Sequence, residues 1–507
     1  MRLRPALLAL LLAPSLAAAQ ATFRVTLDGG ARSEPARGRL VVFVIREGSK
    51  VADREPIDGP FWDDPQPLFG IDTELAPGAS VVVDDRADAF PLEPSQLAPG
   101  QYRAQARFDL VRANSEWRRE PGNLWSDAAS FTVATGKPLE VTLALTHVVA
   151  PEPLPVAEGV EWFELRSELL SKFRGHDVFL RAGVVLPKDH DPKRKYPAQY
   201  EVPGFGGDHR SAAGGRRRRA PEEGAAAELA RASFRIVLDP EGPNGHSLFA
   251  DSENNGPCGA ALVQELIPAL EQKYPLIASP DARILRGHSS GGWSTLWLAL
   301  TYPETFGASW STAPDPVDFR RFQRIDIYAG GNFYFEESGE AIPSLRSDGR
   351  VTLTVFHESR GEDILGPDNT SGQQWDSWFA VFGPKNARGN PAALFDPESG
   401  ALDPAVAAAY RKYDLGELLR RDPARYLPLF RKNIHLICGT EDSFYLNEAV
   451  QLLSDELGKH PRDAADTGYV KLVPGDHGSV FGHEAMRAIP GEVLAHFRAA
   501  GHVSAGP

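Results

Sequence analysis

The sequence predicts an α/β fold with a mainly parallel sheet, preceded by a separate all-β domain. The residues before about 150 read as short strands between turns, with no long segment of helical period. From residue 157 onward strands alternate with helices, which is typical of a parallel sheet covered by helices on both faces. The 507 residues, 42% apolar and 24% charged, have globular composition and suffice for two hydrophobic cores.

Residues 1–19 have the layout of a secretory signal peptide. Arg2 and Arg4 precede an apolar run from Ala6 to Leu16, and three small residues, Ala17–Ala19, follow it. The run is too short to remain as a membrane anchor, and no cysteine follows the expected cleavage site to accept a lipid. We therefore expect a secreted or periplasmic protein that is not a lipoprotein and does not insert into a membrane.

Residues 20–149 are expected to form an immunoglobulin-like β-sandwich. In the stretch Gly100–Phe108 (GQYRAQARF) apolar and polar side chains alternate, and Leu139–Leu145 alternates in the same way. Pro99-Gly100 opens the first of these runs, as a turn before a strand would. The Pro-rich residues 150–156 (APEPLPV) are expected to be a stiff linker to the second domain.

Residues 157–507 are expected to form the α/β domain. A helix is predicted from Ala260 to Tyr274, where apolar residues recur at helical spacing. The long stretch between Ser311 and Ile434 fits poorly into a single crossover, so residues of about 320–430 are expected to form a cap over the site. Strands are predicted at Tyr196–Val202, Phe234–Leu238, Ala282–Arg286, Phe306–Ser311, Ile434–Cys438 and Tyr469–Val473.

Charge and cysteine content argue against several classes of partner and cofactor. The net charge of −14 argues against nucleic acid and anionic membranes, and the basic run Arg216–Arg219 is expected to be a solvated loop beside an acidic segment. Cys258 and Cys438 are expected to be buried thiols, with a disulfide as the alternative. No metal-ligand spacing and no Gly-rich phosphate loop is evident, so no metal and no cofactor is implied.

A Gly-x-Ser-x-Gly motif, Gly287-His288-Ser289-Ser290-Gly291, stands between an apolar strand and a helix. This placement is typical of a nucleophile elbow, a sharp turn that projects the serine hydroxyl off the sheet while glycines let neighbouring backbone pass closely. Small residues around a serine also occur in ordinary strand-to-helix turns, which is the alternative. We predict the α/β-hydrolase fold, with Ser289 as the nucleophile.

A serine nucleophile requires a base near the end of the chain. The hydroxyl must be deprotonated by a neighbouring histidine, and in this fold the chain order is serine, acid, histidine. His477 follows a strand and lies in a Gly-rich loop (PGDHG), so it is the predicted base. His483 is the alternative, but it opens what reads as the last helix.

The base in turn needs a carboxylate that orients it. Asp442 stands just past an apolar strand, 35 residues before His477, and is the predicted acid. Glu441 and Asp315 are alternatives, the latter following the preceding strand. Each of these carboxylates could instead cap a helix or close a turn.

Acyl transfer also needs donors that face the developing oxyanion. The backbone N–H of Ser290 is one candidate, because it directly follows the nucleophile. The second is expected from the loop Pro203–Gly207, with the N–H of Phe205 preferred and that of Gly206 as the alternative. Further candidates to line the substrate pocket, all in loops at the same sheet edge, are His209, His246, Asn254 and Asn255.

From about Tyr196 to Ser479 these motifs resemble the esterase family that includes esterase D, feruloyl esterases and enterochelin esterases. The matching segments are GFGG, ENNGPCGAALVQELIPAL, RGHSSGGW, STAPDPVDF, CGTED and PGDHG, in this order. The resemblance implies a Ser-Asp-His triad on Ser289, Asp442 and His477. Enterochelin esterases also carry an N-terminal β-sandwich, which the first half of this chain looks like. The usual His-Gly before the oxyanion loop is Pro203-Gly204 here, and the insertion before CGTED is long.

Together these residues predict a secreted, cofactor-free serine esterase. Its expected partner is a small-molecule or glycan-linked carboxylic ester, which it hydrolyses through an acyl-enzyme. One alternative is a peptidase or an acyltransferase with the same triad. Another, of a different class, is a non-catalytic binding protein built on a hydrolase fold.

Overall fold

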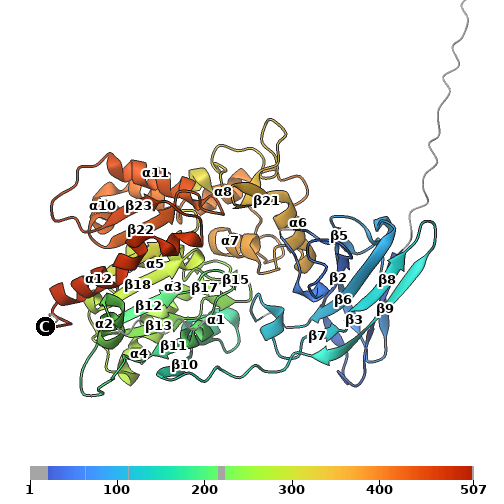
Figure 1. The fold of residues 1–507 in the computed structure, drawn as a ribbon, viewed down its shortest axis with the longest axis horizontal. Helices are drawn as coiled ribbons and strands as arrows, with labels where there is room; N and C mark the ends of the chain where they lie inside the picture. The colour runs from blue at the N-terminus through green and yellow to red at the C-terminus, as the bar shows by residue number, and fades with distance from the viewer. Residues whose placement is uncertain (1–20, 63, 112, 215–222, 505–507) are drawn as a thin grey trace, which may run out of the picture. The chain divides into compact units, whose positions relative to one another are not determined.

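The computed structural model describes residues 21–62, 64–111, 113–214 and 223–504 (Figure 1). The expected signal peptide, residues 1–19, and the basic run Arg216–Arg219 lie outside the described residues. The chain forms two compact units, one of Met1–Val111 with Gly122–Val149 and one of Arg112–Pro121 with Ala150–Pro507. Each unit is described by itself below.

The first unit is an all-β region with one connected set of nine strands. The strand order is β4-β1-β9-β7-β6-β2-β3-β5, with β8 also paired to β6, and among the described residues all of these pairs are antiparallel except β1 with β9. Its immunoglobulin-like character stays a prediction. The strands are β1 (Ala21–Leu27), β2 (Ala36–Arg46), β3 (Leu68–Leu75), β4 (Ser80–Val83), β5 (Asp88–Phe90), β6 (Gly100–Asp109), β7 (Leu124–Ser126), β8 (Ala129–Val133) and β9 (Leu139–Val148).

Strand β6 contains the alternating run expected from the sequence. Its apolar face, which includes Tyr102 and Phe108, is buried in the core of this unit. The opposite face is also covered in part, because Gln105 and Arg107 are buried as well. Gln105 donates from Nε2 to the carbonyl of Ser126 at 2.8 Å, so this buried amide is satisfied within the unit.

The second unit is built on an eight-stranded sheet of order β10-β11-β13-β12-β18-β19-β22-β23. The pairs from β13 to β23 are parallel, and only β10 and β11 at one edge run antiparallel to their neighbours. The expected mainly parallel sheet is therefore confirmed. Its strands are β10 (Val160–Arg166), β11 (Phe179–Val185), β12 (Ala198–Val202), β13 (Phe234–Leu238), β18 (Arg283–His288), β19 (Ala308–Thr312), β22 (Ile434–Gly439) and β23 (Tyr469–Val473).

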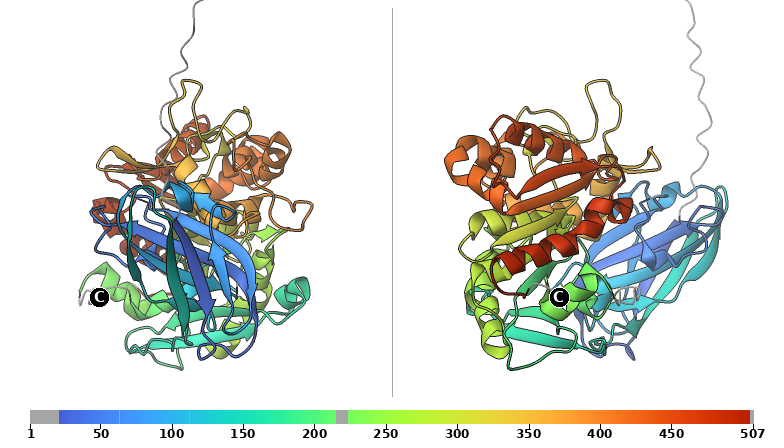
Figure 2. Two further views of the ribbon diagram at one scale, coloured as in Figure 1. Left: turned by 90° about the vertical axis from the view of Figure 1, so that its right-hand side faces the viewer. Right: turned by 60° about the vertical axis from the view of Figure 1, so that its left-hand side comes forward.

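Helices cover both faces of this sheet, as Figures 1 and 2 show. On one face α2 and α12 pack on alternate strand residues such as Ile284 and Ile437. On the other face α4, α5 and α11 pack on their neighbours, such as Leu285 and Leu436. These helices are α1 (Glu168–Arg174), α2 (Ala225–Ala232), α3 (Cys258–Ala261), α4 (Ile267–Lys273), α5 (Ser290–Thr301), α11 (Leu446–Gly458) and α12 (Glu484–Ala499).

The helix expected over Ala260–Tyr274 is present but interrupted. It runs as α3, a π-helical turn over Leu262–Leu266, and α4. Pro268 stands in the first turn of α4 and has no N–H to donate, which accounts for the irregular turn before it. The apolar stripe of this helix is buried as expected, including Leu262 and Leu270.

The segment between β19 and β22 holds five helices and a hairpin within the described residues. It shares the core of the unit, since Trp375 and Trp378 lie in the same apolar cluster as Trp293 of α5. That it acts as a cap stays a proposal. Its elements are β20 (Pro343–Ser347), β21 (Arg350–Thr354), α6 (Val355–Leu365), α7 (Gln374–Phe382), α8 (Pro404–Tyr410), α9 (Leu415–Arg421) and α10 (Pro423–Lys432).

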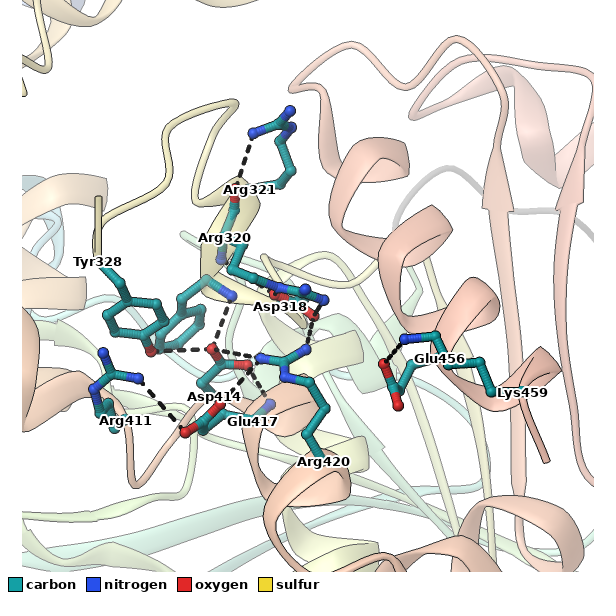
Figure 3. Close-up of polar contacts among 11 residues, drawn as sticks. Asp318, Arg320, Arg321, Tyr328, Arg411, Asp414, Glu417, Arg420, Glu456 and Lys459 are labelled. Carbon is teal, nitrogen blue, oxygen red and sulfur yellow. Dashed lines mark hydrogen bonds and ion pairs between the residues drawn. The ribbon is translucent and has the colours of Figure 1, made fainter. Parts of the chain in front are cut away.

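A buried ionic network joins the start of this segment to α9. Figure 3 shows Arg420 of α9 between the carboxylates of Asp318 and Asp414. Both carboxylates are fully buried, and the Asp414 carboxylate also accepts hydrogen bonds from the Tyr328 hydroxyl at 3.0 Å and the Phe319 amide at 3.1 Å. The residues that follow β19 are therefore fixed to α9 by charge and by hydrogen bonds.

Cys258 and Cys438 are both free and buried, which confirms the expectation of two buried thiols over a disulfide. Burial raises the pKa of Cys258 to about 12, so this thiol stays protonated near neutral pH. Within the part of the chain that the structure describes, no helix combines the length and the hydropathy that crossing a membrane requires.

Candidate active site

Ser289 occupies a strained turn between β18 and α5. Its backbone has φ 58° and ψ −127°, a conformation that non-glycine residues rarely adopt. The turn is held at both ends, because the Ser289 N–H donates to the Thr312 carbonyl at 3.0 Å and the Ser289 carbonyl accepts from the Trp293 N–H at 3.0 Å. This geometry is that of a nucleophile elbow.

The glycines of the motif are required by close backbone approach. A Cβ on Gly287 would lie 2.2 Å from the Gly291 carbonyl oxygen, and one on Gly291 would lie 2.0 Å from the Val202 carbonyl oxygen. Both distances are far below van der Waals contact, so only glycine fits at these two positions. The tight turn that raises Ser289 above the sheet depends on them.

His477 and Asp442 meet at the carboxyl ends of neighbouring strands. Nδ1 of His477 lies 2.8 Å from Oδ2 of Asp442, and the aspartate side chain is fully buried. The other carboxylate oxygen accepts from the backbone N–H groups of Phe444 at 2.9 Å and Leu446 at 3.3 Å. Asp442 is thus held in one orientation and can fix the imidazole of His477 with Nε2 facing away from it.

His288, the residue before the candidate nucleophile, contacts His477 directly. Its Nε2 lies 3.1 Å from the His477 carbonyl oxygen, and the two rings are 4.3 Å apart at their centroids. Burial lowers the pKa of His288 to about 4, so the imidazole is neutral near pH 7 and Nε2–H donates to this carbonyl. The elbow and the loop of His477 are therefore linked by a hydrogen bond.

The alternatives to the predicted base and acid have other partners in the structure. His483 accepts from the Ala485 N–H at 3.1 Å and caps α12. Glu441 is exposed. Asp315 is buried and accepts hydrogen bonds from the Ser290 hydroxyl and Trp378 Nε1, whereas the carboxylate that contacts the His477 imidazole is that of Asp442.

The segments that carry the two candidate oxyanion donors both lie next to Ser289. Ser290 is the first residue of α5, where the N–H groups have no acceptor within the helix and the helix dipole favours negative charge. The loop carrying Phe205 passes beside the nucleophile, since a Cβ on Gly204 would lie 3.3 Å from the Ser289 Cβ. Gly206 has φ +73° and supports the turn closed by the Gly207 N–H and the Gly204 carbonyl at 3.0 Å.

The four residues predicted to line the pocket contact other protein groups. His246 is buried and donates from Nε2 to the Pro203 carbonyl at 2.9 Å, so it holds the loop that carries Phe205. Burial lowers the pKa of His246 to about 4, which keeps the imidazole neutral. The other three also have protein partners: His209 pairs with Asp239 at 2.9 Å, Asn255 accepts from Asn244 at 3.0 Å, and Asn254 donates to the carbonyls of Ala380 and Gly383.

Several contacts at the site had no signal in the sequence. The supporting roles of His246 and His288 depend on backbone carbonyls that the fold brings close. Trp378 of α7 reaches Asp315 across 63 residues of chain. Among the described residues, no group of three or more histidine, cysteine, aspartate or glutamate side chains is arranged to hold a metal ion.

One family model matches the chain, over residues 180–394, and its description is "Putative esterase". The match includes the GFGG loop, Ser289 and Asp315, and it ends before Asp442 and His477. The matched part of the second unit is therefore similar to an esterase family. No curated protein matches the chain by sequence.

Several solved structures match this chain weakly. A ferulic acid esterase is 16% identical, with a TM-score of 0.41, over 67% of this chain and 98% of its own. An S-formylglutathione hydrolase from Agrobacterium tumefaciens is 16% identical, with a TM-score of 0.38, over 68% and 96%. The fluorophosphonate-binding serine hydrolase F of Staphylococcus aureus is 14% identical, with a TM-score of 0.37, over 67% and 99%. Likenesses this weak carry no inference about the substrate of this chain.

Proposed function

We propose that this esterase-like serine hydrolase cleaves carboxylic esters with Ser289 as nucleophile, His477 as general base and Asp442 as the residue that orients the base. The observation that carries the proposal is the 2.8 Å contact between His477 and the buried Asp442, beside a serine held in a strained elbow. Structural ion pairs also bury carboxylates, but they do not require a serine with positive φ at the end of another strand of the same sheet.

In the proposed reaction the Ser289 hydroxyl attacks the ester carbonyl while His477 Nε2 accepts its proton. The N–H groups of Ser290 and Phe205 donate to the oxyanion, each contributing about 3 kcal/mol to the transition state. His477 then gives the proton to the leaving alkoxide, and an acyl-enzyme remains on Ser289. Water, deprotonated by His477, attacks the acyl group and releases the acid, while Asp442 keeps the imidazole of His477 oriented.

We also propose where the protein is located and how its domains are organised. The signal-like layout of residues 1–19 supports export to the periplasm or the medium. In the proposed organisation residues 20–149 form an immunoglobulin-like sandwich, residues 150–156 form a linker, and residues of about 320–430 form a cap. The elements described between β19 and β22 support a cap that could shape the substrate pocket.

Turnover of p-nitrophenyl esters tests the proposal against its alternatives. We expect wild-type protein to hydrolyse short p-nitrophenyl esters and Ser289→Ala to lose at least about 10³-fold in kcat. Cleavage of matched p-nitroanilide amides at a comparable rate would favour a peptidase, and ester products formed with an added alcohol would favour an acyltransferase. Wild-type protein without any Ser289-dependent turnover would leave the binding protein as the better account.

A further inference from the structure

Asp315 is a buried carboxylate directly behind the nucleophile elbow that the proposed reaction does not use. It follows β19, and its side chain is 2% exposed. Its Oδ2 accepts from the Ser290 hydroxyl at 2.8 Å and from Nε1 of Trp378 at 2.8 Å. Neither donor is charged, so the carboxylate has no cation among these two partners to offset its burial.

The backbone of the segment that contains Asp315 is also hydrogen-bonded to the elbow. The Thr312 carbonyl accepts from the Ser289 N–H at 3.0 Å, and the Asp315 N–H donates to the Ser289 carbonyl at 3.3 Å. The carboxylate adds a third contact, to the side chain of the next residue, Ser290. These three contacts fix the strained serine and the first residue of α5 on one rigid strand end.

Trp378 connects this arrangement to the segment between β19 and β22. It lies on α7 and is 2% exposed, with its ring packed edge-on against Trp375 and Phe322. The indole N–H is the only hydrogen-bonding group of a tryptophan side chain, and here it donates to Asp315. Packing therefore fixes the indole, and the indole fixes the carboxylate.

We propose that Asp315 is a positioning residue of the oxyanion hole, which holds Ser290 through its hydroxyl so that the Ser290 N–H stays aimed at the oxyanion. This inference rests on the proposed function, because it assumes that Ser290 supplies an oxyanion donor. An aspartate is a costly choice for packing alone, since burial raises its pKa to about 6. Destabilising groups that persist in a core are typical of functional positions.

The expected effect is on kcat and not on KM. Oxyanion donors act mainly in the transition state, so a misaligned donor slows acylation without weakening the binding of the ester. Removing a donor outright typically lowers kcat by about 10²- to 10³-fold, and loosening one should cost less. We expect a loss of about 10- to 100-fold for Asp315→Ala.

Two variants separate positioning from packing. Asp315→Ala removes the acceptor, whereas Asp315→Asn keeps an acceptor oxygen of the same shape. With p-nitrophenyl acetate, we expect Asp315→Ala to lower kcat about 10- to 100-fold with KM within about threefold of wild type. We expect Asp315→Asn to restore kcat to within about fivefold of wild type. Trp378→Phe, which removes only the indole donor, should lower kcat to an intermediate value.

Each outcome of this experiment supports or contradicts the positioning role of Asp315. Wild-type kcat in Asp315→Ala, or an unchanged kcat with a raised KM, would overturn the positioning role while leaving the esterase proposal intact. If wild-type protein shows no Ser289-dependent turnover, the proposed function and this inference both fail. Where Asp315→Ala does not fold, the order wild type, Asp315→Asn, Trp378→Phe in falling kcat supports the inference, and equal kcat in all three contradicts it.

Discussion

Nε2 of His288 donates to the carbonyl of His477 at 3.1 Å, so the residue before the candidate nucleophile holds the loop of the candidate base. The Gly-x-Ser-x-Gly pattern leaves this position open, and here a neutral histidine fills it. The elbow therefore does more than present Ser289. It also fixes the backbone of the candidate base, His477.

Replacing His288 should loosen this link. His288→Phe keeps a ring against His477 but loses the donor, and one hydrogen bond contributes about 1 kcal/mol. We expect kcat to fall about five- to tenfold with short esters. His288→Gln, which keeps a donor of similar reach, should recover most of this loss. Equal kcat in His288→Phe and wild type would show that the hydrogen bond does not position His477.

Substitution of Asp442 should lower kcat far more than substitution of its neighbour in sequence, Glu441. Asp442→Asn keeps the shape but no longer accepts the Nδ1 proton of His477, which favours the wrong tautomer, and we expect kcat to fall about 10³- to 10⁴-fold. Glu441→Gln is the matched control, because Glu441 is exposed, and its kcat should stay at the wild-type value. Similar losses in the two variants, or none in Asp442→Asn, would refute the assignment of the acid.

The stability of the protein should depend on the charge of Asp315. Its pKa in the folded chain is about 6 against an ordinary 3.8, so between these values the folded state binds more protons than the unfolded state. The contribution of the Asp315 carboxyl group to the free energy of unfolding is therefore lost as pH rises from about 4 to about 6. Asp315→Asn has no such proton, and its free energy of unfolding relative to wild type should rise by roughly 2 kcal/mol over this range.

Urea unfolding at about pH 4.5 and about pH 7.5 measures this difference, because titrations common to both proteins cancel. A difference in unfolding free energy that is the same at both pH values would mean that Asp315 does not carry the raised pKa.

The network in Figure 3 should contribute to stability through Arg420. Arg420→Met removes the cation shared by the buried carboxylates of Asp318 and Asp414, and because Arg320 still pairs with Asp318 we expect a loss of about 3 kcal/mol in unfolding free energy. Lys459→Met is the control, since Lys459 is 66% exposed and its pair with Glu456 should contribute less than about 1 kcal/mol. Comparable losses in both variants, measured by urea unfolding, would contradict a special role for the buried network.

The parts of the fold that were predictable have local signals. The apolar run Ile434–Cys438 marks β22 because a strand buried on both faces needs apolar side chains at every position. The elbow was recognisable from glycines whose need is set by neighbouring backbone. Chain order in the fold then placed Asp442 and His477.

The parts that were missed depend on contacts between distant segments. Nothing near Trp378 indicates that its indole would meet Asp315, because α7 packs where the whole core directs it. His209 and His246 were expected to line a pocket from their place in loops at the sheet edge. In the structure His209 Nδ1 lies 2.9 Å from Asp239 and His246 donates to the Pro203 carbonyl, and that the two histidines line a pocket stays a prediction.

The most direct test of Ser289 as the nucleophile is the intact mass of the protein after reaction with a fluorophosphonate, followed by peptide mapping. If Ser289 is the nucleophile, we expect one adduct per chain, located on Ser289 and absent from Ser289→Ala. An unmodified wild-type protein, or an adduct that persists in Ser289→Ala, would contradict it.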